Sequence, residues 1–163
     1  MTAIGADAKN DIPNMGCHLI LDFHGTDVDL NNFEELNKNF TRIIKESGAH
    51  IEDVMHKNFE PQGLSILYLL SESHFSIHTW PEFGACAIDF YHCGETAKER
   101  MIKAREMLWE YFGKDKCTGN IIVDRGSYKY TLTPQNENTS VLIKEAKIEE
   151  RKNVNISMEE DIS

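Results

Sequence analysis

The sequence contains no long hydrophobic run, no closely spaced pair of cysteines and no excess of basic residues, and each absence excludes a class of protein. No stretch approaches the roughly 18 consecutive apolar residues of a membrane-spanning helix, so we expect no membrane partner. The opening MTAIGADAKNDIPN lacks the apolar core of a signal peptide, which predicts a cytoplasmic location. The net charge of −10 argues against nucleic acid as a partner, because phosphate binding needs a basic surface.

The cysteines also indicate a reducing compartment. There are four, and no two of them form a CxxC pair: Cys17, Cys86, Cys93 and Cys117. This spacing predicts free thiols rather than a disulfide framework. The rest of the composition, 40% hydrophobic residues in a chain of 163, is typical of one globular domain.

The periodicity of apolar residues predicts two helices and six or seven strands. The first helix ends near Ser47-Gly48, and its apolar residues recur at steps of three and four: Leu30, Phe33, Leu36, Phe40, Ile43 and Ile44. The second helix runs from Ala97 to Tyr111 and is closed by Gly113. Strands are predicted at 18–23, 50–58, 64–71, 74–80, 84–92, 120–124 and 128–131.

The order of these elements predicts the fold class. With two helices for six or seven strands, the sequence β-α-β-β-β-β-α-β-β favours an α+β fold, a two-layer sandwich of an antiparallel sheet with two helices on one face. Residues 1–15 are polar and are expected to form a flexible arm. The domain is predicted to span 16–133, and the polar segment 134–163 is expected to be a mobile tail.

The segment LSESHFSIHTWPE, residues 70–82, is the most unusual part of the chain. It places three serines, two histidines, two glutamates and a tryptophan in a run that otherwise has the pattern of a strand. A buried polar group that finds no partner costs about 1–3 kcal/mol, so strands seldom carry so many without a reason. We therefore interpret this segment as part of a chemical site.

Strand geometry constrains how Ser73 and His78 could act together. The two residues are five positions apart, so on an uninterrupted strand they would point to opposite faces, roughly 16 Å apart. They can share a pocket only if the chain turns or bulges near Ser73. The polar break at 71–74 is where we expect a turn, and a strained peptide bond there would suit an N→O acyl shift.

A metal site at His74 and His78 is not expected. Their separation on an extended strand is about 13 Å, too far for both to bind one ion. A helix would bring them together, but Ile77, Thr79 and Pro81 favour a strand.

The segment closely resembles the self-cleavage region of the short, prokaryotic-type S-adenosylmethionine decarboxylases. The resemblance rests on Ser65, on Glu72-Ser73-His74, on the Thr79–Glu82 run and on Cys93-Gly94, and it covers about residues 16–131. It implies that the protein breaks its own Glu72–Ser73 bond and converts Ser73 into a covalent pyruvoyl group. The products would be chains 1–72 and 73–163.

The resemblance also assigns roles to other residues. The pyruvoyl ketone condenses with the substrate amine and accepts electrons as CO₂ leaves. His78 would assist processing, Cys93 would donate the proton that the α-carbon needs, and Ser65 would support both steps.

Two further residues are candidates for substrate binding. Phe59 matches the family's position for a residue that stacks on adenine, although it could instead be a core phenylalanine. Glu82 could accept hydrogen bonds from ribose hydroxyls or the substrate amine, or could be a surface carboxylate.

The resemblance therefore implies a pyruvoyl-dependent decarboxylase that supplies decarboxylated S-adenosylmethionine for spermidine synthesis. The family acts as a homodimer of processed two-chain protomers, with sites at or near the interface. Two alternatives remain open. The same machinery could act on ornithine or arginine, or the chain could be a non-enzymatic, unprocessed module that binds a ligand or regulates a decarboxylase.

Overall fold

The computed structural model describes residues 15–126, which form a six-stranded antiparallel sheet and two α-helices. In chain order the elements are β1 (Gly16–Phe23), α1 (Phe33–Glu46), β2 (Ile51–Asn58), β3 (Leu64–Leu70), β4 (Ser73–Trp80), the short 3₁₀ turn η2 (Pro81–Phe83), β5 (Ala85–His92), α2 (Ala97–Phe112), the 3₁₀ turn η3 (Lys114–Lys116) and β6 (Cys117–Arg125). The strands lie side by side in the order β2-β3-β4-β5-β1-β6.

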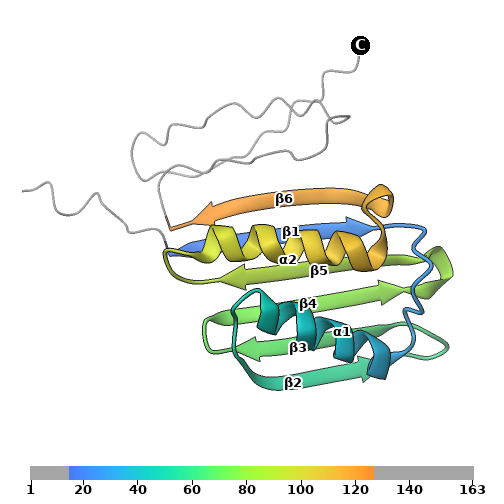
Figure 1. The fold of residues 1–163 in the computed structure, drawn as a ribbon. Coiled ribbons are helices and arrows are strands. Elements are labelled where there is room, and N and C mark those ends of the chain that lie inside the picture. The colour runs from blue at the N-terminus through green and yellow to red at the C-terminus, as the bar shows by residue number, and fades with distance from the viewer. Residues whose placement is uncertain (1–14, 127–163) are drawn as a thin grey trace, which may run out of the picture.

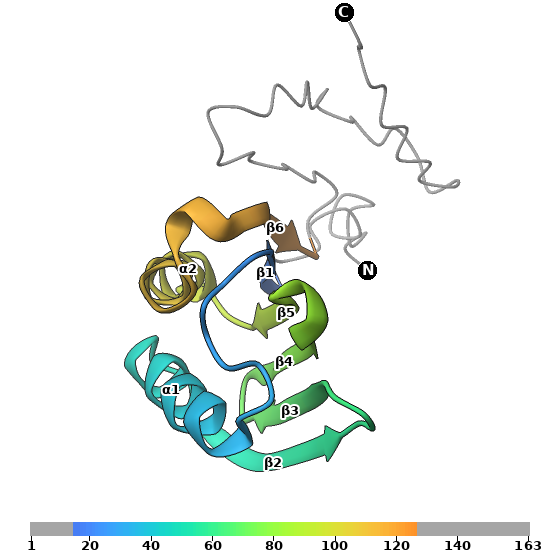
Figure 2. The same ribbon diagram turned by 90° about the vertical axis from the view of Figure 1, so that its right-hand side faces the viewer.

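The predicted fold class is confirmed. Both helices lie in front of the sheet in Figure 1, and the view along the sheet in Figure 2 shows them on one side, with no described element on the other. The last described strand is longer than predicted, since β6 begins at Cys117 rather than at residue 120. The expected strand at 128–131, the tail and all of the arm except Met15 lie outside the described residues, and the domain boundaries stay a prediction.

Alternation along the strands separates a buried face from an exposed one. On β4 the buried residues are Phe75, Ile77 and Thr79, and the residues between them face the helix-free side. The helices complete the core. Of the apolar stripe that the sequence predicts for the first helix, Leu30 lies in the turn before α1 instead of in the helix, although it is buried. Phe40 packs its ring against those of Tyr68 and Phe75. The core therefore lies between the helices and one face of the sheet.

The helix-free face of the sheet carries exposed apolar side chains as well as polar ones. Four large hydrophobic residues on this face are between 38% and 65% exposed: Met55, Leu67, Leu69 and Ile121. An exposed apolar surface of this kind is typical of a contact with another molecule. Between residues 15 and 126, no helix is long and apolar enough to cross a membrane.

Candidate active site

The Glu72–Ser73 peptide bond lies where the β3–β4 turn meets β4. The turn falls at Ser71 and Glu72, within the polar break where the sequence predicts one. From Ser73 onward β4 pairs with both neighbours without a bulge, so Ser73 and His78 stay on one extended strand. The turn therefore does not bring these two residues together, because it precedes Ser73 instead of separating it from His78.

Three groups surround the Glu72–Ser73 bond. The Oγ atom of Ser73 is 3.2 Å from Nδ1 of His74, within hydrogen-bond distance. The backbone N–H of Cys93 donates to the carbonyl oxygen of Glu72 at 3.2 Å, on the carbon that the serine would attack. Cys93 itself is a free, exposed thiol that directly follows β5. A hydroxyl, an imidazole and a backbone N–H thus lie around one peptide bond.

His50, in the loop before β2, binds the side chain of Glu72. Its carboxylate accepts hydrogen bonds from the backbone N–H of His50 at 3.2 Å and lies 3.1 Å from Nδ1 of that residue. Burial raises the pKa of Glu72, but these contacts outweigh it and hold the pKa below its ordinary value. A hollow of about 300 Å³ opens beside this loop, along residues 48–51.

Ser65 and His78 form a second group, further along the sheet. Antiparallel pairing places the two residues opposite each other on β3 and β4, and Ser65 Oγ lies 2.6 Å from His78 Nδ1. His78 is exposed on the helix-free face. The structure thus brings these two predicted site residues together, but places them away from Ser73.

Phe59 and Glu82 lie at the opposite end of the sheet from the Glu72–Ser73 bond. Phe59 is 50% exposed, so the alternative of a core phenylalanine is wrong. The carboxylate of Glu82 accepts a hydrogen bond from Gln62 Nε2 at 3.2 Å, which links η2 to the β2–β3 loop. In Figure 1 this loop and η2 lie to the right, whereas the β3–β4 turn and the end of β5 lie to the left. Their roles in substrate binding stay predictions.

A polar cluster on the helix-free face was missed by the sequence analysis. His18, Tyr91 and His74 form one cross-strand row over β1, β5 and β4, with the His18 and His74 ring centroids 6.2 Å apart. His18 Nε2 lies 3.1 Å from Asp89 Oδ1. Burial lowers the pKa of His18 and the Asp89 carboxylate raises it, with a net lowering. Period-two alternation on β4, extended to β5 and β1, is the signal that could have identified this cluster.

Tyr91 connects this row to Cys93. Its hydroxyl donates to the carbonyl of Met15 at 3.1 Å, and Arg125 lies over its ring, 5.3 Å from the centroid. Burial and then the nearby Cys93 thiol raise the pKa of Tyr91, although Arg125 opposes them. A protonated phenol therefore neighbours the Cys93 side chain.

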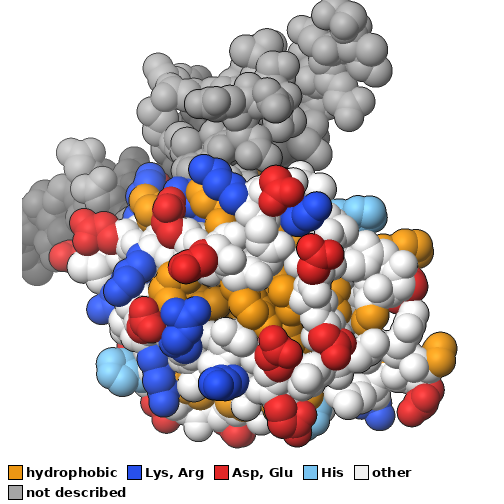
Figure 3. Space-filling model, turned by 45° about the vertical axis from the view of Figure 1, so that its right-hand side comes forward, with side chains coloured by type: hydrophobic (Ala, Val, Ile, Leu, Met, Phe, Trp, Pro, Cys, Tyr) orange, Lys and Arg blue, Asp and Glu red, His pale blue; other side chains and the backbone are white. Residues whose placement is uncertain are grey.

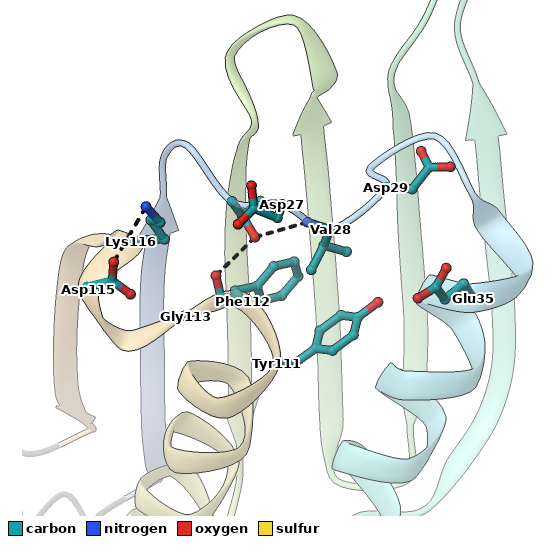
Figure 4. A pocket seen from close by; sticks show the side chains of 10 residues that line it. Asp27, Val28, Asp29, Glu35, Tyr111, Phe112, Gly113, Asp115 and Lys116 are labelled. Carbon is teal, nitrogen blue, oxygen red and sulfur yellow. Dashed lines mark hydrogen bonds and ion pairs between the residues drawn. The ribbon is translucent and has the colours of Figure 1, made fainter.

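A larger hollow, of about 690 Å³, lies away from these groups. On the face that Figure 3 shows, apolar side chains gather in the middle with acidic ones around them. Figure 4 shows the hollow between the end of α2, the start of α1 and the loop after β1, with Asp27, Asp29 and Glu35 among its lining residues. The hydroxyl of Thr26 donates to Phe112 O at 3.0 Å and so ties the loop to α2. No predicted site residue lines this hollow.

Metal binding has no support from the described residues. Between residues 15 and 126, no group of three or more His, Cys, Asp or Glu side chains is arranged to hold an ion. His74 and His78 both lie on β4, as the sequence predicts.

Comparisons with known proteins agree on one family. The family model described as S-adenosylmethionine decarboxylase matches residues 17–126. A Caldicellulosiruptor saccharolyticus protein named S-adenosylmethionine decarboxylase proenzyme is 42% identical over 82 residues, 50% of this chain and 66% of that protein. A Brevibacillus brevis protein of the same name is 48% identical over 82 residues, 50% of this chain and 62% of its own length. The chain thus spans slightly less than two thirds of these relatives.

A solved structure has the same fold. The crystal structure of the adenosylmethionine decarboxylase from Aquifex aeolicus superimposes with a TM-score of 0.62 at 24% identity. The superposition covers 77% of this chain and 98% of the Aquifex chain.

The exposure of the cysteines predicts selective labelling. In Ser73→Ala, iodoacetamide at pH 8 should modify Cys93 and leave three buried cysteines unmodified: Cys17, Cys86 and Cys117. Burial raises the pKa of Cys17 and of Cys86 to about 12, so neither is a thiolate at pH 8. Peptide mass mapping checks the result, and Cys93→Ala in the same background should take up no label. Fast labelling of Cys17 or Cys86 would contradict the structure.

Proposed function

Because the chain belongs to the S-adenosylmethionine decarboxylase family, we propose that it is a self-processing, pyruvoyl-dependent enzyme that converts S-adenosylmethionine to its decarboxylated form for spermidine synthesis. The observation that carries the proposal is the surroundings of the Glu72–Ser73 bond. A hydroxyl beside an imidazole and a backbone donor on the neighbouring carbonyl are the groups that an acyl shift requires.

The proposed self-cleavage begins with an attack by Ser73 Oγ on the carbonyl carbon of Glu72. His74 accepts the hydroxyl proton, and the negative charge that forms on the Glu72 oxygen is stabilised by the Cys93 N–H. The C–N bond then breaks, the nitrogen of Ser73 takes up a proton, and an ester joins Glu72 to Ser73 Oγ. Loss of the α-proton of Ser73 expels the Glu72 carboxylate, and hydrolysis of the dehydroalanine releases ammonia and leaves the pyruvoyl group.

Cys93 is proposed as the proton donor in turnover. The pyruvoyl group, once formed, supplies the electron sink for decarboxylation. It would occupy the start of β4. Cys93, which follows the last residue of β5, lies beside that position. An exposed thiol at this point can deliver a proton to the substrate α-carbon after CO₂ has left.

A complete site needs a second copy of the chain. Ser73 and the Ser65–His78 pair are roughly 16 Å apart along one strand, too far for His78 to act on Ser73 of its own chain. The exposed apolar residues on the helix-free face support a homodimer in which two such faces meet. In that arrangement His78 of the partner subunit would assist the processing of Ser73. One end of each sheet would then combine with the opposite end of the other sheet into one site.

The substrate class rests on Phe59 and Glu82. An exposed phenylalanine can stack on adenine, and a nearby carboxylate can accept hydrogen bonds from ribose hydroxyls. Ornithine and arginine have no ring to stack, so Phe59→Ala should weaken binding of an adenosyl analogue if the substrate is S-adenosylmethionine. A cytoplasmic location is part of the same proposal.

Self-cleavage is the first prediction of the proposed function. The purified protein should consist of chains 1–72 and 73–163, the second beginning with pyruvate, and intact mass measures both. Ser73→Ala should stay one inactive chain because alanine has no Oγ to attack. Ser76→Ala, which changes a serine on the same strand, should cleave normally. A wild-type chain that remains intact under native conditions would rule out the enzyme and favour a non-enzymatic module.

The two-copy site predicts rescue between chains. His78→Ala alone should accumulate uncleaved or ester-linked precursor, and hydroxylamine should split the ester. Co-expression with a differently tagged Ser73→Ala chain should restore cleavage of the His78→Ala chain, because each mixed dimer contains one complete site. His24→Ala, at an exposed loop histidine, serves as the control and should cleave normally. Mixed dimers that form but do not cleave would show that His78 acts within its own chain.

The role of Cys93 predicts a loss of turnover with most cleavage retained. Cys93→Ala keeps the backbone N–H that contacts Glu72 but removes the thiol, so decarboxylation should fall by about 10²–10⁴-fold. The pyruvoyl carbon should then be protonated instead, which leaves alanine at the start of the 73–163 chain and inactivates the enzyme. Turnover assays with mass analysis of that chain measure both effects. Wild-type turnover without excess inactivation would show that another group supplies the proton.

A further inference from the structure

A buried histidine and an arginine lie directly behind the proposed cleavage site, and the mechanism above uses neither. His92, the last residue of β5, is 2% exposed and lies opposite Ser73 in the strand pairing. Arg100 lies on the first turns of α2 and is partly buried. The sequence analysis assigned no role to either residue, because neither belongs to the motif around Ser73.

The hydrogen bonds of these two residues form a chain across three elements. The guanidinium nitrogen Nη1 of Arg100 donates to the carbonyl oxygen of Gly48 at 2.6 Å and lies 2.9 Å from Nε2 of His92. The other ring nitrogen of His92, Nδ1, lies 2.7 Å from the carbonyl oxygen of Cys93. The loop after α1, the start of α2 and the end of β5 are thus joined at Cys93.

The partners determine the protonation state of His92. A guanidinium only donates hydrogen bonds, so Nε2 of His92 must accept from Arg100. Nδ1 must then carry the proton, and it donates to the carbonyl oxygen of Cys93. Burial lowers the pKa of His92, which agrees with a neutral ring beside a cation. With both nitrogens engaged, His92 cannot act as a base for Ser73.

These contacts hold Cys93 from both sides of its α-carbon. Its carbonyl oxygen is bound by His92, and its N–H donates to the Glu72 oxygen. Gly16, at the start of β1, packs closely against the backbone of His92 and Cys93. A Cβ on Gly16 would lie 2.9 Å from the Cys93 α-carbon and would clash with the His92 carbonyl oxygen. Gly16 has a φ of 145°, which also favours glycine.

We propose that His92 and Arg100 are positioning residues that fix the orientation of Cys93, so that its N–H is directed at the Glu72 carbonyl during self-cleavage and its thiol at the same position during turnover. The proposal rests on the proposed function for these two steps. A donor of an oxyanion site is effective only when it is already aimed at the oxygen that becomes charged. A misplacement of about 1 Å can cost up to about 100-fold in rate.

Two substitutions of His92 test its hydrogen bond to Cys93. His92→Asn keeps an N–H near the Nδ1 position, whereas His92→Leu removes both hydrogen-bonding groups of the ring. His92→Leu should slow self-cleavage by about 10- to 100-fold, and His92→Asn should restore most of the rate. Cell-free synthesis followed by a time course on denaturing gels measures cleavage from the moment the chain is made.

Turnover supplies a measurement that a purely structural role would not change. In matured enzyme, the fraction of turnovers that end with alanine on the 73–163 chain should rise about tenfold in His92→Leu and stay near the wild-type value in His92→Asn. Arg100→Leu should behave like His92→Leu, whereas Arg42→Leu, at an exposed arginine of α1, should have no effect. Cleavage at the wild-type rate in His92→Leu, or equal losses in His92→Leu and His92→Asn, would overturn the proposal.

A spectroscopic test does not depend on activity. In uncleaved Ser73→Ala, ¹⁵N NMR of the His92 ring should show a protonated Nδ1 and an unprotonated Nε2 at neutral pH. Arg100→Leu should abolish this preference for one tautomer. An imidazolium or an Nε2-protonated ring would overturn the positioning network even if the wild type cleaves. A wild type that does not cleave would instead refute the proposed function, with the NMR result unaffected.

Discussion

The antiparallel pairing of β4 with β3 and β5 is the constraint on which the candidate site depends. It places Ser73 opposite His92 on one side and Ser65 opposite His78 on the other. It also places the Cys93 N–H against the Glu72 carbonyl, so that the bond proposed for cleavage and its hydrogen-bond donor depend on the same register. A slip of one residue would turn every side chain of β4 to the opposite face. It would separate Ser65 from His78 and change the surroundings of Ser73.

The core, rather than the site, holds this register. Phe75 and Ile77 of β4 are fully buried, and burying a side chain of this size contributes about 1.5–3 kcal/mol. A hydrogen bond such as that between Ser65 and His78 contributes only about 0.5–1.5 kcal/mol net. The helix-free face can therefore carry reactive groups and exposed apolar residues, because the opposite face already determines the pairing. That division leaves Ser73 and His78 about 16 Å apart in one chain, which is why the proposed site draws on a second copy.

Much of the fold could be predicted because its pattern is local. Alternation located β5 to within a residue, and the three-four periodicity of α1 identified its buried face. Exposure of Phe59 was not predictable in the same way, since a phenylalanine in a short loop has the same sequence signature whether it is buried or not. The sequence predicts no processing role for His74 beyond its place in the Glu72-Ser73-His74 motif, although its Nδ1 lies 3.2 Å from Ser73 Oγ. The contact depends on side-chain rotamers at a strand end, which no periodicity encodes.

The sequence by itself determined the element types, the two-layer architecture, a turn within residues 71–74 and the parity that separates Ser73 from His78, because each follows from backbone geometry over a few residues. Only the tertiary structure decided which groups meet. Ser65 reaches His78 across a hairpin, His50 reaches Glu72 from the loop before β2, and Arg100 reaches His92 from a helix. These contacts depend on the pairing register and on how the helices pack over the sheet. Both are properties of the whole folded chain, since they minimise exposed apolar surface over all the elements at once.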